Sequence, residues 1–343
     1  MTLSDPLSAA ATRFGPALDR ELREAVPDES RGAIYRLVRY HLGWATQNGV
    51  VARAEPGKRL RPYLLLLACE SAGGRADGGL PAAAAVELLH NFSLIHDDIQ
   101  DRSPQRRHRA TVWSIWGEAQ AINAGDVLHA IASRSFLRCA ERGVSLGATH
   151  RALALFHESC YRLVEGQYLD LTFESRVDVS PAEYLAMVDG KTGALIAACV
   201  EIGAVLAGRD GAAWRAVGRA FGRAFQIVDD VLGVWGDPAV LGKSVDDDIR
   251  SAKKSLPVLL ARESLSATDR TCLDTLYGAD RRSDDDVETI RRMLDQSGAR
   301  ERALDHARAA AMEGEAALAV IQERGAAVAP LTSLLRVLVE RHR

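Results

Sequence analysis

Aspartates gather at the end of one apolar segment, residues 88–101, as Asp97, Asp98 and Asp101. Asp97 and Asp101 are four residues apart, so on a helix they lie on one face with Cβ atoms roughly 5–6 Å apart. The helix is expected to end before Pro104, because proline disfavours helical geometry in the residue that precedes it. The three acids therefore occupy the last turn of a helix.

Negative charge in that last turn is unfavourable, because the helix dipole is already negative there. The group therefore needs a cation nearby. Carboxylate oxygens suit Mg²⁺, which binds one or two carboxylates together with substrate phosphates more readily than an all-protein cage. For this group alone, the alternative is a solvated polar helix end.

A second apolar segment, residues 214–235, also carries polar residues near its end, Gln226, Asp229 and Asp230. It stops at residues 236–238, Gly-Asp-Pro. The lysines that follow are Lys243, Lys253 and Lys254. Both segments thus combine an apolar helical stripe, paired acids, a chain breaker and then cations. Two such copies indicate a shared function rather than chance.

Further cations accompany these acids. Three of them, Lys58, Arg59 and Arg61, stand at an expected helix start, and three more, Arg106, Arg107 and Arg109, follow the first acids. Cations at a helix start oppose the dipole unless an anion binds there. Arginine is well suited to bidentate phosphate contact. The alternatives are a basic surface turn and internal ion pairs between the loop and the helix end.

Lys191 interrupts the otherwise apolar residues 187–206 and is flanked by Gly190 and Gly193. A lysine in such a run is rarely buried unpaired, so it either extends its ammonium to water or reaches a buried phosphate. The glycines favour a kink and a close backbone approach. His90, two turns before Asp97, is on its own more typical of a core histidine than of a ligand.

The whole sequence predicts an all-α protein of one domain, residues 1–343, because helix-forming residues dominate and strand patterns are nearly absent. A flexible turn is expected at residues 73–79 and a solvated loop at residues 280–288, which contains Asp284 to Asp286. Helices are expected over residues 8–26, 30–47, 63–69, 82–101, 117–142, 149–173, 187–206 and 214–235, and helical segments with a break at Pro330 over residues 299–343.

Composition excludes several classes of protein. The formal net charge is −3, which does not favour binding to nucleic acid or to an anionic membrane. The five cysteines are scattered, which argues against a disulfide framework or a zinc site. The N-terminus lacks a signal-peptide pattern and no apolar run is long enough to cross a bilayer. We therefore expect a cytoplasmic protein.

The motifs as a set resemble those of the trans-isoprenyl diphosphate synthases, or polyprenyl synthetases, and among these the short-chain geranylgeranyl type. The resemblance extends from Gly57 to Pro257. The motifs are GKRLRP at 57–62, HDDIQD at 96–101, RR at 106–107, KT at 191–192, FQIVDD at 225–230, LGK at 241–243 and KKSLP at 253–257. The resemblance implies antiparallel helices around a deep central cavity, of the class I isoprenoid synthase type. It also implies a homodimer.

The resemblance also implies roles for individual residues. Isopentenyl diphosphate and an allylic diphosphate would be condensed with the help of about three Mg²⁺ ions. The metal ligands would be Asp97, Asp98, Asp101 and Asp229, with Asp230 nearby. The allylic diphosphate would be bound by Arg106, Lys191, Thr192, Gln226, Lys243 and Lys253. Isopentenyl diphosphate would be bound by Lys58, Arg61, His90 and Arg107.

The sequence departs from the family pattern at two positions. Gly233 replaces the usual third aspartate of the second motif, so one outer carboxylate is lost. Asp237, which lies beyond a turn, is the candidate to substitute for it. His108 stands where the family usually has glycine. Neither change removes a principal ligand, so we expect activity.

Product length is expected to depend on Phe92 and Ser93, five and four residues before Asp97. The growing tail would pass Ser93 and meet Phe92, which resembles a short-chain enzyme with a product near C20. Two alternatives remain: a class I terpene cyclase, which needs no second diphosphate site, and a non-catalytic prenyl-diphosphate-binding subunit.

Overall fold

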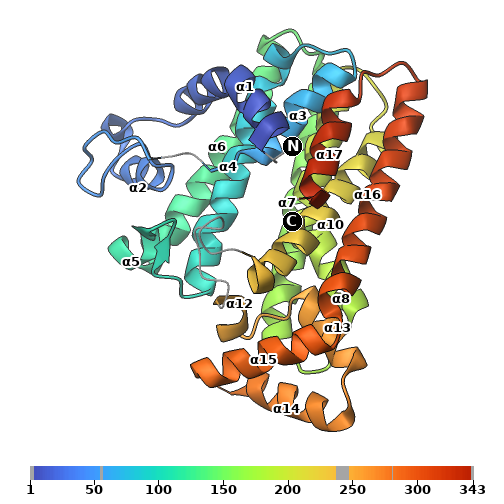
Figure 1. The fold of residues 1–343 in the computed structure, drawn as a ribbon. Helices are drawn as coiled ribbons and strands as arrows, with labels where there is room; N and C mark the ends of the chain where they lie inside the picture. The colour runs from blue at the N-terminus through green and yellow to red at the C-terminus, as the bar shows by residue number, and fades with distance from the viewer. Residues whose placement is uncertain (1–3, 55–56, 237–246, 280, 341–343) are drawn as a thin grey trace. The chain divides into compact units, whose positions relative to one another are not determined.

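The computed structural model describes residues 4–54, 57–236, 247–279 and 281–340. These residues form two compact units. Unit 2 comprises Ser4–His157 and Cys199–Gly211, and unit 1 comprises Glu158–Ala198 and the described residues from Ala212 onward. Two of the divisions fall inside helices, α7 and α9, and a third precedes α10; α7 and α10 are labelled in Figure 1.

Unit 2 contains most of the N-terminal helices and one short hairpin. Its elements are α1 (Ser4–Ala25), the 3₁₀ turn η1 (Glu29–Arg31), α2 (Ile34–His41), α3 (Leu60–Ser71), α4 (Ala76–Gln100), β1 (Gln105–Arg106), β2 (Arg109–Ala110), α5 (Val112–Trp116), α6 (Glu118–Glu141) and the first part of α7 (Leu146–Glu174). The last turns of α9 (Ala194–Leu206) also belong to it.

Unit 1 contains the remaining helices. They are the rest of α7, α8 (Pro181–Val188), the π-helical turn η2 (Asp189–Gly193), the start of α9, α10 (Ala212–Trp235), α12 (Asp247–Arg250), α13 (Leu256–Ser264), α14 (Ala267–Gly278), α15 (Asp284–Gln296), α16 (Ala299–Glu323) and α17 (Ala329–Glu340). The all-α prediction is confirmed.

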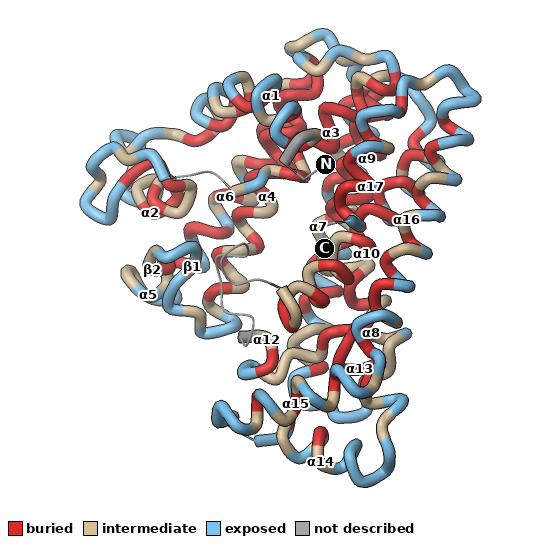
Figure 2. The backbone as a smooth tube through the Cα atoms, in the orientation of Figure 1, coloured by how far each residue is buried: buried red, intermediate tan, exposed pale blue. Residues whose placement is uncertain are grey.

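Helix α4 is the central element of unit 2. It packs against α3 and α6, and residues 78–89 are all buried (Figure 2). A helix that is apolar all round belongs in a core. The small residues Ala82 to Ala85 are fully buried and let neighbouring helices approach closely. This burial fixes the helix whose last turn carries the first acids.

The turn expected at residues 73–79 is wrong in its second half, because α4 begins at Ala76 and includes Gly78 and Gly79. A Cβ on Gly78 would lie 3.1 Å from Val144, and one on Gly79 would lie 3.4 Å from Leu66. Close packing with neighbouring segments therefore overrides the poor helix propensity of glycine.

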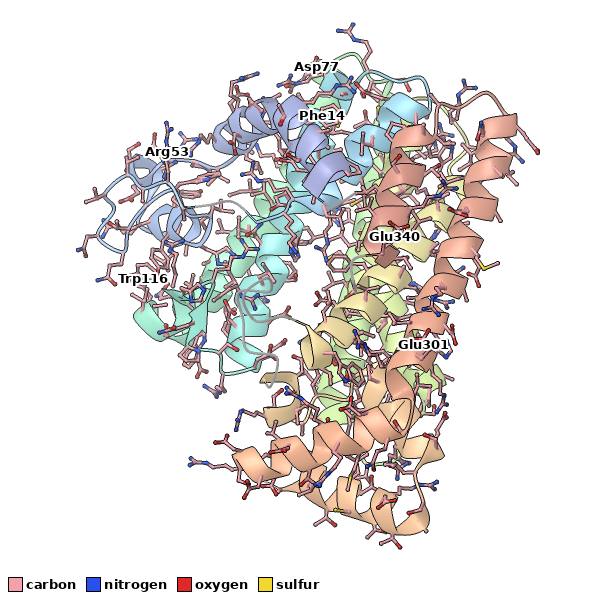
Figure 3. The ribbon with its side chains drawn as sticks, viewed as in Figure 1. Phe14, Arg53, Asp77, Trp116, Glu301 and Glu340 are labelled. Carbon is pink, nitrogen blue, oxygen red and sulfur yellow. The ribbon has the colours of Figure 1, made fainter. Side chains whose placement is uncertain are left out.

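A buried acid joins α1 to α6. Glu21 is 1% exposed and lies 2.8 Å from Arg138 and 2.5 Å from Arg142. Arg142 also lies 2.9 Å from Asp77 of α4, which is labelled in Figure 3. Removing one partner of such a buried group is strongly destabilising, so this network holds α1 against the core of unit 2.

In unit 1, α10 packs against α16, α17 and η2. Its buried residues include Phe221, Val228 and Val231, and the core extends to α13 and α15. The last turn of α10 therefore has a fixed place relative to α13, which matters for the second group of acids.

Residues Asp284 to Asp286 form the first turn of α15 rather than the expected loop. Ser283 and Asp286 make a capping box, and acids in the first turn complement the helix dipole. These acids thus have a local structural explanation.

The described cysteines are all free, and three of them are buried. Burial raises the pKa of Cys69 to about 11 and keeps its thiol neutral. Among the described residues, none of the helices has the combined length and apolarity that a bilayer span requires.

Candidate functional site

The predicted site residues fall into two groups, one in each unit. The first group lies at the end of α4 and in the segments around it, and the second lies in η2, at the end of α10 and before α13. Lys243 and Asp237 lie outside the described residues.

The acids at the end of α4 differ in exposure. Asp97 is half-buried and Asp101 is exposed, whereas Asp98 is only 2% exposed. Asp98 lies 2.7 Å from Arg106, which donates to its Oδ1. Burial raises the pKa of Asp98, although Arg106 opposes the shift. One predicted internal ion pair between the loop and the helix end is therefore present.

Arg106 and Arg107 are placed by a two-residue β-hairpin. Arg106 pairs with Arg109 across the strands, and Arg107 and His108 form the turn. Both turn residues have positive φ, 51° for Arg107 and 59° for His108. Such turns favour glycine or asparagine. This explains why a glycine would suit position 108 and shows that both residues are held in strained backbone conformations.

A cluster of basic side chains forms around Arg61, His90 and Arg107. Nη1 of Arg61 lies 3.3 Å from Nε2 of His90. A Cβ on Gly57 would lie 2.5 Å from Nη2 of Arg107, so the loop that contains Lys58 packs directly against this guanidinium. Three of the four residues predicted to bind isopentenyl diphosphate, Arg61, His90 and Arg107, are therefore close together. The fourth, Lys58, directly follows Gly57, which contacts Arg107.

His90 of this cluster and His41, at the end of α2, are both neutral. Burial lowers the pKa of His90 well below its usual value, and Arg61 and Arg107 lower it further. Burial, followed by the positive charges of Arg106 and Arg107, lowers the pKa of His41 to about 3. Cations that suppress the charge of their neighbours in this way make a strong site for an anion.

Glu87 is a buried acid of this region that the sequence reading missed. It is 9% exposed, and burial raises its pKa while Arg59 and Arg61 oppose the shift. Asn91 donates to Oε1 of Glu87 at 3.3 Å. The sequence did contain a signal for Glu87, because this residue lies one turn before His90 on the same face of α4.

Two of the arginines noted in the sequence have structural roles. Arg59 is buried and lies 2.7 Å from Asp19 of α1. Arg109 donates to the carbonyl of Tyr40 at 3.0 Å and lies over the Tyr40 ring. Tyr40 also stacks edge-on against Trp116, labelled in Figure 3. These contacts hold the hairpin against α2 and α5.

The predicted chain-length residues lie one turn below the acids. The ring of Phe92 is 4.7 Å from that of His96 and 5.4 Å from that of His129 on α6. Ser93 is buried, and its hydroxyl donates to the carbonyl of His90 at 2.9 Å. Phe92 is thus part of an aromatic group between α4 and α6.

In unit 1, the predicted kink at Lys191 is a π-helical turn, η2, which joins α8 to α9. Such turns occur frequently at functional sites. A Cβ on Gly166 of α7 would lie 2.0 Å from the backbone nitrogen of Lys191, so α7 and η2 are in backbone contact. The expected close backbone approach is present.

Three polar contacts hold η2. Asp189 accepts two hydrogen bonds of 2.6 Å from Arg223 of α10. Lys191 donates to Asp170, and Thr192 donates to Gln226 at 2.9 Å. The lysine is therefore paired, and its partner is Asp170 of α7.

Asp230 is the most buried acid of the second group, with 0% exposure. It accepts hydrogen bonds from the Tyr184 hydroxyl, from Gln226 at 3.0 Å and from the backbone nitrogen of Leu256 at 3.2 Å. The ammonium of Lys253 lies 3.8 Å from it. Burial raises the pKa of Asp230, and these donors oppose the shift. Asp229, one residue earlier, is half-buried.

Lys253 lies among acids. Burial alone would lower the pKa of its ammonium, yet the surrounding carboxylates raise it above its usual value. Those carboxylates belong to Asp230, Asp248, Asp229 and Asp170. Lys253 therefore stays charged and neutralises part of this acidic region.

The donor set suits a hard divalent cation, because partly exposed carboxylates such as Asp97, Asp101 and Asp229 offer oxygen ligands. Within the described ranges, no three His, Cys, Asp or Glu side chains are close enough to hold an ion by themselves. Mg²⁺ usually binds one or two carboxylates together with substrate phosphates, and the arginines and lysines described above carry the positive charge that phosphates require.

The family model described as Polyprenyl synthetase matches residues 45–294. The chain is 40% identical to (2E,6E)-farnesyl diphosphate synthase of Mycobacterium tuberculosis (strain ATCC 25618 / H37Rv), over 89% of this chain and 85% of that protein. It is 39% identical to geranylgeranyl diphosphate synthase of the same organism, over 80% of this chain and 76% of that protein.

Two solved structures are similar to this chain over nearly its whole length. A polyprenyl synthetase from Streptomyces coelicolor A3(2) has a TM-score of 0.85 at 35% identity, covering 98% of each chain. A polyprenyl synthase from Caulobacter crescentus CB15, complexed with calcium and isoprenyl diphosphate, has a TM-score of 0.82 at 31% identity, covering 99% of this chain and 97% of that one.

The strained turn gives one prediction. We expect His108→Gly to stabilise the protein by about 1 kcal/mol or less, because glycine removes the left-handed strain at a small cost in chain entropy. The matched control is Gln105→Gly, in the extended strand β1, which should lower stability. Thermal unfolding of both variants is the measurement, and a lower midpoint for His108→Gly would contradict the strain argument.

Proposed function

The chain belongs to the polyprenyl synthetase family and is a prenyltransferase, and we propose that it joins isopentenyl diphosphate head to tail to an allylic diphosphate. The proposed product is a short-chain trans-prenyl diphosphate near C20. The similarity to both farnesyl and geranylgeranyl diphosphate synthases supports a short-chain product.

One observation supports this function more than any other. Arg61, His90 and Arg107 form a basic cluster within unit 2, in addition to the ion pairs that Lys191 and Lys253 make within unit 1. A synthase must bind two diphosphates, whereas a cyclase binds one. The basic cluster is the proposed site for isopentenyl diphosphate.

Metal binding is proposed for the partly exposed acids Asp97, Asp101 and Asp229. The calcium-bound relative from Caulobacter crescentus supports a divalent cation. Asp98 was predicted among the ligands, but its burial and its ion pair with Arg106 favour a positioning role. When bound, Mg²⁺ would lower the charge of the diphosphate and improve it as a leaving group.

The side chains perform the remaining steps. Cations such as Arg106, Lys191 and Lys253 would donate to diphosphate oxygens and stabilise the charge that develops as the allylic C–O bond breaks. The alkene of isopentenyl diphosphate forms the new C–C bond with the allylic cation, and a proton is then lost to the departing diphosphate. Apolar residues such as Phe92 would exclude water that could trap the cation.

The isolated protein should convert isopentenyl diphosphate and an allylic primer, in the presence of Mg²⁺, into a product longer by C5 units. Asp97→Ala and Asp229→Ala should each lower kcat/KM on the order of 10²–10³-fold, because each removes charge stabilisation from the transition state. Asp284→Ala, in the exposed first turn of α15, is the matched control. Product analysis by mass spectrometry is the measurement.

Two results would contradict this function. A hydrocarbon or alcohol formed without isopentenyl diphosphate would identify a terpene cyclase. Diphosphate binding without turnover would identify a non-catalytic subunit.

Product length gives a further prediction. Phe92→Ala should lengthen the product by at least one C5 unit, because it removes the ring that packs against His96 and His129. Phe92→Tyr keeps a ring of similar size and should keep the wild-type length. Chromatography of the products from one primer is the measurement, and identical product distributions for wild type and Phe92→Ala would rule out this role.

A homodimer is also proposed. Tyr161, Val164 and Tyr168 lie on one face of α7 and are 55%, 51% and 70% exposed. Exposed aromatic stripes are typical of protein interfaces. We expect Tyr161→Arg combined with Tyr168→Arg to give a monomer. Met312→Arg, at an exposed site on α16, should remain dimeric. Light scattering after size exclusion measures the mass, and a dimer of unchanged stability in the double variant would exclude this surface.

A further inference from the structure

The π-helical turn η2 is joined to α10 by two side-chain contacts with the same spacing. Asp189, the first residue of η2, accepts hydrogen bonds of 2.6 Å from both Nε and Nη2 of Arg223. Three residues later in each segment, Thr192 donates to Gln226 at 2.9 Å. Residues three apart on a helix are neighbours on its surface, so the two contacts lie side by side and fix η2 against α10 at two points.

Glycines bring the backbones together beside these contacts. A Cβ on Gly222 of α10 would lie 2.7 Å from Cα of Gly193, and a Cβ on Gly190 would lie 3.0 Å from Cα of Gly166 on α7. A side chain at Gly222 would therefore force the two segments apart. The turn that contains Lys191 is thus packed between α7 and α10 at backbone distance.

The ion pair is better suited to orienting the turn than to stabilising the fold. Hydrogen bonds between a guanidinium and a carboxylate are strong, and a bidentate pair fixes the orientation of both groups. The side chains of Arg223 and Asp189 are 28% and 30% exposed, so solvent screens their attraction and the pair adds little to stability. Turns of the π type also occur frequently at functional sites.

We propose that Asp189 and Arg223 are positioning residues for the allylic diphosphate site. By fixing the start of η2, the pair holds the backbone that carries Lys191 and Thr192, the two residues of the turn that are proposed to bind this diphosphate. The pair acts through the turn and not by direct contact with the substrate. The inference rests on the proposed function for the identity of the ligand, and on the contacts of η2 for the role of the pair.

The chain contains a matched control pair. Arg262 of α13 donates to both carboxylate oxygens of Asp274 of α14, at 2.7 and 3.0 Å. These side chains are 27% and 30% exposed, almost the same as those of Arg223 and Asp189. The control pair has the same chemistry and burial, but it joins α13 to α14 rather than α10 to η2. A general loss of stability should be alike in the two pairs, whereas an effect on the allylic site should be confined to Asp189 and Arg223.

Isothermal titration calorimetry with geranyl thiodiphosphate and Mg²⁺ measures binding without turnover, because the C–S bond of this analogue ionises far more slowly than an allylic C–O bond. Asp189→Asn and Arg223→Gln should each weaken binding about tenfold. The double variant should bind no more than about twofold more weakly than either, because both changes remove one contact. Asp274→Asn and Arg262→Gln should bind like wild type. All four single variants should lower the unfolding midpoint by similar amounts, about 1–3 °C.

Steady-state kinetics add a readout that a purely structural role would not change. In Asp189→Asn, KM for the allylic diphosphate should rise about tenfold, while kcat and KM for isopentenyl diphosphate should stay within about twofold of wild type. Such a split indicates that binding is lost at only one of the two substrate sites.

Three results would overturn the role of the pair. They are unchanged affinity for the analogue in Asp189→Asn, an equal loss of affinity in the control pair, and additive losses in the double variant. Weaker binding confined to Asp189 and Arg223 supports the pair even if wild type forms no prenyl product and the proposed function fails. Product formation with unchanged affinity in Asp189→Asn refutes the pair alone. If Arg223→Gln does not fold, Asp189→Asn, which keeps the shape of the side chain, decides.

Discussion

The buried carboxylate of Asp230 is the contact on which the second acid group depends. A fully buried charge is costly unless each oxygen is bonded and a counter-ion is near. Asp230 meets that requirement with a tyrosine hydroxyl, a glutamine amide, the first backbone nitrogen of α13 and the ammonium of Lys253. These donors come from α8, α10, α13 and the segment before it, so satisfying one charge fixes four pieces of chain around it.

The same division appears in the first acid group. In each Asp-Asp pair the second residue is buried and paired. Asp98 pairs with Arg106, and Asp230 accepts three hydrogen bonds and lies near the ammonium of Lys253. The first residue of each pair, Asp97 or Asp229, remains half-buried. One aspartate of each pair thus organises the local structure, and its neighbour is the one proposed to bind a ligand. Strain at Arg107, a proposed binding residue, is likewise tolerated because the surrounding contacts hold the turn.

The sequence predicted what local patterns determine. Helical spacing placed both acid groups at helix ends, and the glycines around Lys191 predicted the close backbone approach. The sequence alone could not show which aspartate of each pair is buried. Burial depends on contacts with Tyr184, Leu256 and Arg106, which come close to the aspartates only in the folded chain. The approach of the Asp248 carboxylate to Gly233, whose Cβ would lie 2.1 Å from Oδ2, was not predictable for the same reason, since Asp248 lies fifteen positions later in the chain. The helical start at Ala76 was missed because tertiary packing outweighed glycine propensity.

The division within the pairs is tested most directly by thermal unfolding of Asp229→Asn and Asp230→Asn, each measured without metal and then with Mg²⁺ and inorganic diphosphate. Without metal, Asp230→Asn should lose about 2 kcal/mol or more, because buried donors lose their acceptor charge, whereas Asp229→Asn should unfold like wild type. With the ligands added, Asp229→Asn should lose most of the stabilisation that wild type gains. Equal losses in the metal-free proteins, or full ligand stabilisation of Asp229→Asn, would contradict the account.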